Sequence, residues 1–569
     1  NGPFGSILWA EKEMTPYPQR LKRATAVLGT LFFSLTAVAQ TATPSLILYN
    51  GKIFTSSAAR PYVQALAIGD DRILASGDSD KIKALAGPHT KQIDLGGRTA
   101  IPGINDAHNH VELAPADTIE LQFKSPDPSW TEVKEAFATP TVARAPKGAF
   151  IRGYVGPSAW KDPELTRDAL DKLAPDHPVM LFVTEHASIL NTAALDRLGI
   201  RENQANPLGG RYERSADGRL TGVLREYASI QAVRKLADMT SDTEAITQLR
   251  NELARAAKFG ITSLQDMSNA IAPDRCVALL EKVPVPIRIR VIRMPPTSPA
   301  GRDTTEGQST PRNPAPLITV SGTKWMLDGT PLERTFEARD AGQHRSGMKF
   351  ETLFTGLDLT FPPSEIKKML RESLRNNDQL MVHVFGYNSA SAMLNAMQAT
   401  GGKKVWAGRR VRFEHGDGLF PDLIPLAREM DVVVVQNPLH LNVGMIFPGL
   451  VLEHAQPFRS LLAAGIPLAL GSDGPTNPYL NIMFASLDSN RPSEAITREQ
   501  AVIAYTLTSA YAEFAEKDKG SLEPGKLADL AVLSQDIFTV DASDLPKTES
   551  VLTMVGGKII YDAKVITTQ

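Results

Sequence analysis

Short apolar runs alternate with longer amphipathic stretches through the middle of the chain, from about residue 99 to residue 471. The runs are bounded by polar or turn-forming residues, as buried strands are, whereas stretches such as 243–259 and 364–376 carry apolar residues at helical spacing. The candidate strands are residues 99–104, 262–265, 287–292, 323–327, 380–385, 411–413, 432–436 and 468–471. Eight strands that alternate with helices predict an α/β fold, a (β/α)₈ TIM-like barrel over residues 100–518.

One interval in this pattern is abnormally long. The first two candidate strands are separated by roughly 150 residues, whereas a strand–helix unit needs about 30. The excess predicts an inserted subdomain of about residues 112–240, with strands of its own at 150–154 and 179–184. A second irregular stretch, residues 295–316, is rich in Pro, Gly, Ser and Thr and predicts a long loop over the barrel mouth.

Both ends of the chain have a different pattern, in which short strands are joined by tight turns. Asn50-Gly51 and Gly69-Asp70-Asp71 each separate two apolar runs and predict hairpins. The runs concerned are residues 46–49 with 52–54 and 65–68 with 72–75, and the far end repeats the pattern at 530–533 and 551–561. Each piece is too short to bury a core alone. We therefore expect one small β-sandwich domain built from residues 40–99 and 519–569, in preference to two independent β modules.

The start of the chain has the layout of a secretory signal peptide. Arg20, Lys22 and Arg23 precede an apolar run, residues 24–38, that ends in a small-x-small cleavage pattern at Ala37-Val38-Ala39. The run is shorter than the ~20 residues that a membrane span requires. We expect residues 1–13 to be a tag or upstream remnant and 14–39 to be the signal peptide. A periplasmic or secreted protein with no membrane span after cleavage is predicted.

Composition narrows the set of partners. The net charge of −2 and the charged fraction of 22% give no reason to expect nucleic acid or an anionic membrane as a partner. A small-molecule substrate is expected, and both a monomer and a homo-oligomer remain open. With Cys276 as the single cysteine, an intrachain disulfide is impossible and a Cys-based metal site is disfavoured.

Chemically active side chains gather where the candidate strands end. His108 and His110 are two residues apart, so both imidazoles of an extended segment face one side, an arrangement that suits a divalent metal. By itself this pair is weak support for a metal site. Functional groups of a (β/α)₈ barrel lie at the carboxyl ends of its strands. The residues at those ends are His108, His110, Lys324, His383, His415, His440 and Asp473.

With these motifs the chain resembles the metal-dependent amidohydrolase superfamily, and within it the branch of the N-substituted formamide deformylases (amidohydrolase family 3). The motifs span nearly the whole chain after the signal peptide. They are Pro102-Gly-Ile-Asn-Asp-Ala-His108-Asn-His110, Thr221-Gly-Val-Leu-Arg-Glu226, Gly260-Ile-Thr-Ser-Leu-Gln-Asp-Met267, Lys324-Trp-Met-Leu-Asp-Gly329, Val382-His383, Glu414-His415-Gly416, Leu470-Gly-Ser-Asp473 and Gly520-Ser-Leu-Glu-Pro-Gly-Lys-Leu-Ala-Asp-Leu530. After His383 the branch commonly has Gly-Asp, whereas this chain has Gly386-Tyr387-Asn388, so the substrate preference does not carry over directly.

The resemblance implies a site for two divalent metal ions, most readily Zn²⁺, with Mn²⁺, Co²⁺ and Fe²⁺ as alternatives. His108 and His110 would hold one ion together with Asp473. The second ion would be held by His383 and His415. Lys324 would carry a CO₂-derived carbamate that bridges both ions, because an unmodified lysine would repel them.

The implied activity is hydrolysis of an amide-type C–N bond (formamide, N-acyl, carbamate or cyclic amide; EC 3.5 class) by a metal-activated hydroxide. Asp473 would be general base and then acid. His440 would contact the substrate carbonyl or oxyanion, unless it belongs to a purely structural loop. His186 and Arg225 are further substrate-binding candidates, and the alternatives are a partly buried histidine and an ion pair.

Two other residue sets are expected to support the site. Asp328 is expected to brace the Lys324 loop. Asn105 and Asn109 alternate with the histidines and are expected to point away from the metals.

Two other functions fit the same scaffold. One is a non-hydrolytic binding or regulatory protein, and the other is an esterase or isomerase of the same superfamily. Fold alone does not decide among them. The complete set of ligand residues favours the enzyme, because a degenerate relative is expected to lack at least one of Lys324, His383, His415 and Asp473.

Overall fold

A computed structural model describes residues 43–566, apart from Glu185, Val285, 331–357, 443–453, Pro475 and 488–490. The predicted signal peptide, residues 14–39, and the upstream residues 1–13 lie outside the described part of the chain. Within that part, no helix combines the length and the apolar character needed to cross a bilayer.

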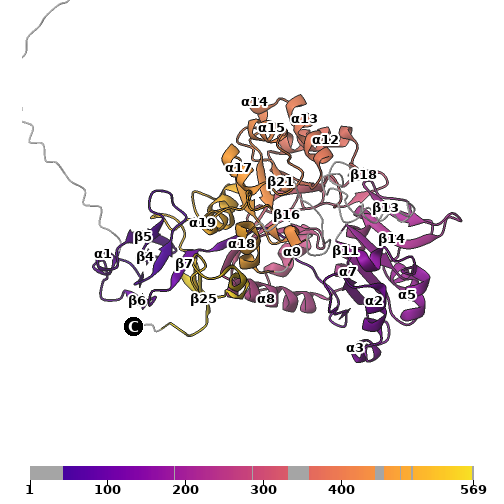
Figure 1. Cartoon of the computed structure of the whole chain (residues 1–569), viewed down its shortest axis with the longest axis horizontal. Helices are drawn as coiled ribbons and strands as arrows, with labels where there is room; N and C mark the ends of the chain where they lie inside the picture. The colour runs from indigo at the N-terminus through magenta and orange to yellow at the C-terminus, as the bar shows by residue number, and fades with distance from the viewer. Residues whose placement is uncertain are drawn as a thin grey trace, which may run out of the picture. The chain divides into compact units, whose positions relative to one another are not determined.

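Eight parallel strands form the central sheet (Figure 1). In spatial order they are β8 (Ile104–Asn109), β15 (Ile261–Ser268), β16 (Arg288–Arg293), β19 (Ile318–Met326), β20 (Leu380–Val384), β21 (Arg412–His415), β22 (Val433–Gln436) and β23 (Leu468–Leu470). The first and last strands meet where the amide of Asp473 donates to the carbonyl of His108 at 3.0 Å. The sheet is therefore a nearly closed (β/α)₈ barrel, as the alternating pattern predicts.

Each predicted barrel strand is present, and only the first is displaced. Residues 99–104 were expected to be one strand, but β7 (Thr99–Pro102) belongs to a different sheet and the barrel strand β8 begins at Ile104. Pro102-Gly103 separates them because proline has no amide to donate to a ladder. Gly103 also lies against β15, where a Cβ would be only 2.1 Å from Thr262 Oγ1.

The barrel helices follow from capping and apolar spacing. Helix α8 (Asp242–Lys258) begins with a capping box in which Ser241 and Glu244 satisfy each other's backbone amides. It buries Leu249 and Leu253 in the main apolar cluster, which also contains Ile261 of β15. The other described α-helices of this region are α9 (Pro273–Leu280), α12 (Pro363–Asn376), α13 (Tyr387–Ala399), α14 (Lys403–Trp406), α15 (Ile424–Glu429), α17 (Phe458–Ala464), α18 (Pro478–Leu487), α19 (Arg498–Ile503) and α20 (Ser509–Ala512).

The segment between β8 and α8 contains a second, six-stranded sheet with an apolar cluster of its own. Its strands, in spatial order, are β13 (Gly210–Arg214), β14 (Leu220–Glu226), β12 (Ala187–Leu190), β11 (Val179–Thr184), β10 (Ile151–Tyr154) and β9 (Ile119–Glu120). The main helices of this segment are α2 (Trp130–Phe137), α5 (Arg167–Leu173), α6 (Thr192–Arg197) and α7 (Tyr227–Asp238). The predicted strands at 150–154 and 179–184 are confirmed as β10 and β11. Trp130, Trp160 and Leu181 belong to the local cluster.

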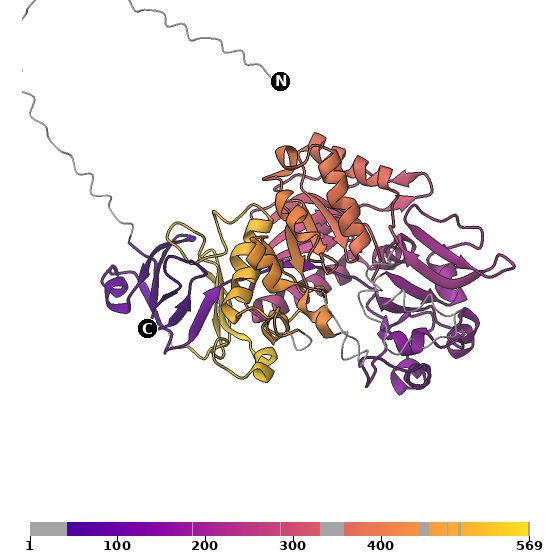
Figure 2. The same ribbon diagram turned by 45° about the horizontal axis from the view of Figure 1, so that its top comes forward.

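The two ends of the chain share a sheet. Its order is β26 (Lys558–Asp562), β25 (Ser550–Val555), β24 (Leu530–Leu533), β7, β2 (Lys52–Phe54) and β3 (Tyr62–Val63). A four-stranded sheet contains β5 (Arg72–Gly77), β4 (Ala65–Gly69), β1 (Leu46–Tyr49) and β6 (Lys91–Asp94). In both views the indigo strands of the chain start lie beside the yellow segment at its end (Figures 1 and 2).

The hairpin predicted around Asn50-Gly51 is wrong. Strands β1 and β2 belong to different sheets, because Gly51 donates its amide to Gln64 and Lys52 donates to Arg98. Asn50 does adopt a positive φ of 56°, so the turn forms without pairing the strands that flank it. The hairpin at 65–75 is confirmed as β4 with β5, and β25 pairs with β26 as expected.

The predicted loop at residues 295–316 has almost no regular structure. It contains only the two-residue strands β17 (Thr297–Ser298) and β18 (Gly301–Arg302). Gln231 of α7 donates to the carbonyl of Thr297, so this loop contacts the segment between β8 and α8.

Candidate active site

The residues singled out at the strand ends converge because parallel strands of a barrel end at one face. His108 lies in β8 and Lys324 in β19, His383 lies in β20, and His415 is the last residue of β21. His110 follows β8, Asp473 follows β23, and His440 lies in a short 3₁₀ helix, η2 (Pro438–Asn442), after β22.

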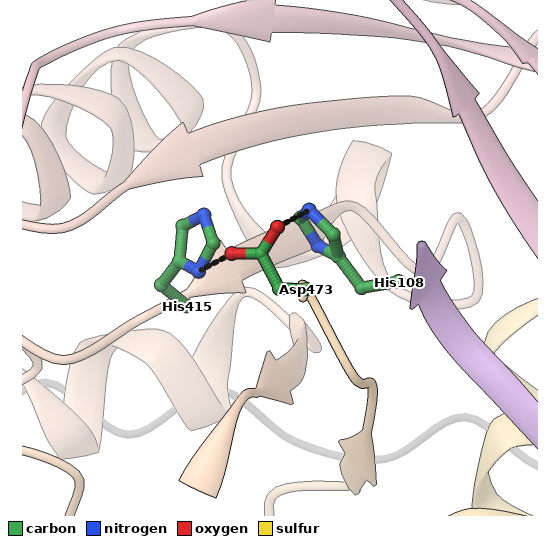
Figure 3. Close-up of side chains that lie close together, drawn as sticks. All are labelled: His108, His415 and Asp473. Atoms are coloured by element: carbon green, nitrogen blue, oxygen red, sulfur yellow. Dashed lines mark ion pairs between the residues drawn. The ribbon is translucent and has the colours of Figure 1, made fainter. Parts of the chain in front are cut away.

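Three of these side chains form a compact set of donors. The ligand atoms of His108, His415 and Asp473 all lie within 4.8 Å of one another. The Asp473 carboxylate lies between the two rings and turns one oxygen toward each (Figure 3). Its Oδ1 is 3.6 Å from His108 Nε2 and its Oδ2 is 3.7 Å from His415 Nδ1. Two imidazoles and a carboxylate at this spacing suit a divalent metal ion.

The other three predicted ligands border this set. His110 Nε2 is 3.3 Å from His108 Nε2 and 3.4 Å from Asp473 Oδ1. The buried Lys324 places its Nζ 3.1 Å from His108 Nε2. The ring of His383 lies 4.4 Å from that of His415, centroid to centroid. The structure thus brings all six predicted ligand residues together.

All four histidines proposed as ligands have an oxygen acceptor at Nδ1, and for His415 this is Asn437 Oδ1 at 2.9 Å. His108 Nδ1 is 2.7 Å from Glu414 Oε2, and His383 Nδ1 is 2.7 Å from Asp328 Oδ1. The Nδ1 atom of His110 is 3.1 Å from the carbonyl oxygen of Met267. An acceptor behind Nδ1 fixes the tautomer and leaves Nε2 as the ligand atom, which is the usual arrangement of metal-binding histidines.

Glu414 is itself held by a buried arginine. Arg412 donates from Nε to Glu414 Oε1 at 2.7 Å and from a terminal nitrogen to the carbonyl of Ala107 at 2.7 Å. Burial alone would raise the pKa of Glu414, but Arg412 and His108 lower it to about 2. The carboxylate behind His108 is therefore ionised throughout the physiological range.

Asp328 ties two loops of the site together. Its carboxylate accepts from the backbone amides of Phe385 and Gly386 and from Ser389, in addition to His383. The expected bracing role is confirmed, and its partner is the turn after β20.

Burial keeps the ligand histidines neutral. It lowers the pKa of His108 to about 4, and it also lowers the pKa values of His110, His383 and His415. Burial opposes ionisation of Asp473, but His108 and His440 hold the pKa of that carboxyl well below its usual range. Neutral imidazoles beside an ionised carboxylate are the protonation states that metal binding requires.

His440 lies between two carboxylates. Its Nε2 is 3.3 Å from Asp473 Oδ2 and its Nδ1 is 3.6 Å from Asp417 Oδ2. Burial alone would lower the pKa of His440, but Asp417 and Asp473 raise it to about 9. His440 also lines the cavity, together with His383, His415 and Asp473.

A cavity of about 960 Å³ opens over the site. His186 is on its wall, 4.6 Å from the ring of His383, whereas Arg225 donates to Glu213 at 2.5 Å and is outside the described residues that line the cavity. Asn109, which was expected to point away from the metals, donates to Ser472 and also lines the cavity. Arg225 therefore forms the ion pair that was the alternative to a substrate-binding role.

Sequence reasoning assigned no role to Glu414 or Asp417, which hold His108 and His440. Each lies within two residues of His415, and this proximity is the one signal that the sequence offers. The partner of Glu414 is 306 residues away, so no local pattern points to it.

The amidohydrolase family matches residues 91–561 of the chain. N-substituted formamide deformylase of Arthrobacter pascens is 25% identical over 548 residues, covering 91% of this chain and 98% of that protein. Protein LONG AFTER FAR-RED 3 of Arabidopsis thaliana is 26% identical over 555 residues, 91% of each chain. A crystal structure of a metal-dependent hydrolase from Pyrococcus horikoshii shares the fold, with a TM-score of 0.60 at 18% identity over 88% of this chain and 99% of that one. The chain belongs to the amidohydrolase family and is a metal-dependent hydrolase.

Proposed function

We propose that this protein hydrolyses an amide-type C–N bond, in a formamide, N-acyl compound, carbamate or cyclic amide. The observation that carries the proposal is the convergence of His108, His415 and Asp473 from three separate strands, with their ligand atoms within 4.8 Å. The relative from Arthrobacter pascens is named for the deformylation of N-substituted formamides, which supports the same bond class.

The donor set fits divalent metal ions. His383 Nε2 is buried and has no hydrogen-bond partner among the described residues, as expected of a nitrogen reserved for a ligand. His108, His110 and Asp473 would hold one ion, and His383 and His415 would hold a second. Imidazole and carboxylate donors favour Zn²⁺.

Lys324 is proposed to bridge the two ions as a carbamate. Its amine is buried beside His108, where a cation would repel a divalent ion. Carboxylation by CO₂ replaces that charge with anionic oxygen donors, which the same position suits.

Bound divalent ions would supply Lewis acidity that polarises a carbonyl and lowers the pKa of water. Asp473 is ionised and faces the cavity, so it accepts a proton from the attacking water and delivers it to the leaving nitrogen. His440 lies 3.3 Å from that carboxylate and is placed to donate to the carbonyl oxygen as negative charge develops there.

The test is metal analysis combined with a screen of N-formyl, N-acyl and carbamate compounds. We expect about two metal ions per chain, as in binuclear hydrolases. Activity should fall by at least ~10³-fold in Asp473→Asn and Lys324→Ala. Short acids such as acetate should restore part of the Lys324→Ala activity if a carbamate is the native group. His89→Ala, which removes an exposed histidine that is not among the described residues lining the cavity, is the control. Full activity of the metal-free protein would sink the proposal.

The two accessory sheets have proposed roles as well. We assign residues 112–240 to an inserted subdomain that shapes the cavity, since Tyr154, His186 and Ile230 of this segment line it. Residues 40–99 and 519–569 are assigned to one β-sandwich domain, because strands of both ranges pair in one sheet.

Export is proposed on the sequence pattern of residues 14–39. If the segment is a signal peptide, N-terminal sequencing of the exported protein should begin near residue 40. A start well upstream of that residue would contradict it.

A further inference from the structure

Glu226, at the corner between β14 and α7, has a backbone conformation that side-chain-bearing residues rarely adopt. Its φ is 50° and its ψ is −127°, in a region that normally requires glycine. Such outliers persist only where surrounding contacts impose them, and they gather at functional sites.

Two bonds join Glu226 to one residue of the cavity wall, His186. The Glu226 amide donates to the carbonyl of His186 at 2.6 Å. The Glu226 carboxylate oxygen Oε2 lies 2.8 Å from His186 Nδ1. The same residue therefore holds both the main chain and the ring of His186.

His186 lies in the turn between β11 and β12, where it faces the cavity. Its side chain is 8% exposed, and its ring is 4.6 Å from that of His383 at an angle of 53°. His383 is held from its own side by Asp328. Both rings line the cavity, and each has a carboxylate at its Nδ1.

The residue after Glu226 reaches the barrel. The buried hydroxyl of Tyr227 accepts from the amide of Met326 at 3.1 Å, two residues beyond Lys324 on β19. The corner 226–227 therefore connects the turn that carries His186 to the strand that carries Lys324. A negative φ at residue 226 would break either the two bonds to His186 or the bond between Tyr227 and Met326.

We propose that Glu226 is a positioning residue that holds His186 against His383, from where the His186 imidazole contacts the substrate. The kinetic test of this role rests on the proposed function, because it uses a substrate of the proposed hydrolysis. Substitution of the neighbouring Arg225 by alanine is the matched control. It removes the ion pair with Glu213 from the same strand and leaves both groups of the Glu226–His186 bonds in place.

The kinetic test uses the most active compound of the N-formyl, N-acyl and carbamate panel. Glu226→Ala should lower kcat/KM at least ten-fold with unchanged metal content, whereas Glu226→Gln, whose amide oxygen still accepts from Nδ1, should keep most of the activity. His186→Ala combined with Glu226→Ala should be no slower than His186→Ala alone, because Glu226 acts through the histidine. Arg225→Ala should stay within two-fold of the wild type.

A second pair of variants separates positioning from stability. Glu226→Gly relieves the backbone strain and removes the carboxylate, so it should have a higher Tm than Glu226→Ala but equally low activity. Additive losses in the double variant, or recovery of activity in Glu226→Gly, would overturn the proposal.

If no compound of the panel is turned over, that result counts against the proposed function alone. The positioning role is then tested by crystal structures. In Glu226→Ala the His186 ring should turn away from His383, with the metal ligands in place. A ring in its wild-type position would overturn the proposal.

Discussion

Glu414 shows how a residue without direct access to substrate sets up the site. It accepts from His108 on one oxygen and from the buried Arg412 on the other, so one carboxylate both orients a ligand and neutralises an arginine. His415 and Asp473 add backbone strain, with φ values of 71° and 43°. Strain of this kind persists where the surrounding structure enforces it, and here the residues that carry it are two of the three central donors.

Replacement of Glu414 by glutamine is expected to weaken metal binding by about 10- to 100-fold, since a ligand histidine loses its carboxylate. Stability should also fall by ~3–5 kcal/mol, because Arg412 would be left buried without a counter-charge. Competition with a chelator measures the first effect and denaturant unfolding the second. Glu112→Gln is the control: Glu112 pairs with Arg152 on the cavity wall, and its loss should leave metal affinity unchanged.

The pH dependence of the metal-free protein follows from the ligand histidines. Burial lowers the pKa of His108 from 6.5 to about 4, so between these values the unfolded chain binds a proton that the folded chain does not. The stabilising contribution is therefore complete above pH 6.5 and is lost as the pH falls toward 4.

The measurement is the difference in free energy of unfolding between the wild type and His108→Gln. This difference removes the opposite contributions of Asp106 and Asp328, whose pKa values burial raises to about 6 and about 7. It should grow with rising pH from 4 to 6.5. A difference that shrinks over this window would contradict the assignment.

At the scale of elements, the site depends on the closure of β8 against β23. Gly471 follows β23 so closely beside His108 that a Cβ there would be 2.4 Å from His108 Cβ and 2.6 Å from its amide nitrogen. Two residues after Gly471, the amide of Asp473 donates to the carbonyl of His108. The seam between the two strands thus sets the separation of two proposed ligands.

Gly471→Ala is expected to push the two strands apart, with loss of metal and a destabilisation of ~1–3 kcal/mol typical of overpacking. Metal content and thermal unfolding measure the two effects. Gly77→Ala is the comparison, because a Cβ at that position meets its neighbours only at 3.6 Å or more. Wild-type metal content in Gly471→Ala would show that the seam tolerates the added methyl group.

At the scale of the whole molecule, the proposed ligands come from strands that are spread between residues 108 and 473, so bound metal would link early and late parts of the barrel. A ligand that binds only the folded state stabilises it by ~4 kcal/mol when its concentration is about a thousand times its Kd.

Removal of metal by a chelator should therefore lower Tm by several degrees, and added Zn²⁺ should restore it. Differential scanning calorimetry measures both steps. Asp473→Asn should show a much smaller shift, since one ligand is missing. An equal shift in that variant would place the stabilising metal elsewhere.

Most of the fold was predictable because barrel strands and helices leave local patterns. Seven of the eight barrel strands appear within a few residues of their expected positions, the first begins at Ile104 instead of Thr99, and the capping residues of α8 mark its start. The hairpin at Asn50-Gly51 failed for the opposite reason. That dipeptide specifies a turn, but β1 pairs with β4 and β6 whereas β2 pairs with β3 and β7.

The sequence by itself determined which side chains reach the mouth of the barrel, because strand ends are set by short apolar runs and His108, His383 and Asp473 each lie at or near such an end. Only the tertiary structure decided what stands behind them. Glu414 meets His108 across 306 residues, and Glu226 meets His186 across 40. Contacts between residues so far apart in the sequence depend on how the strands close into a barrel and on how a strand is connected to the helix that follows it. The spacing of residues along the chain does not encode them.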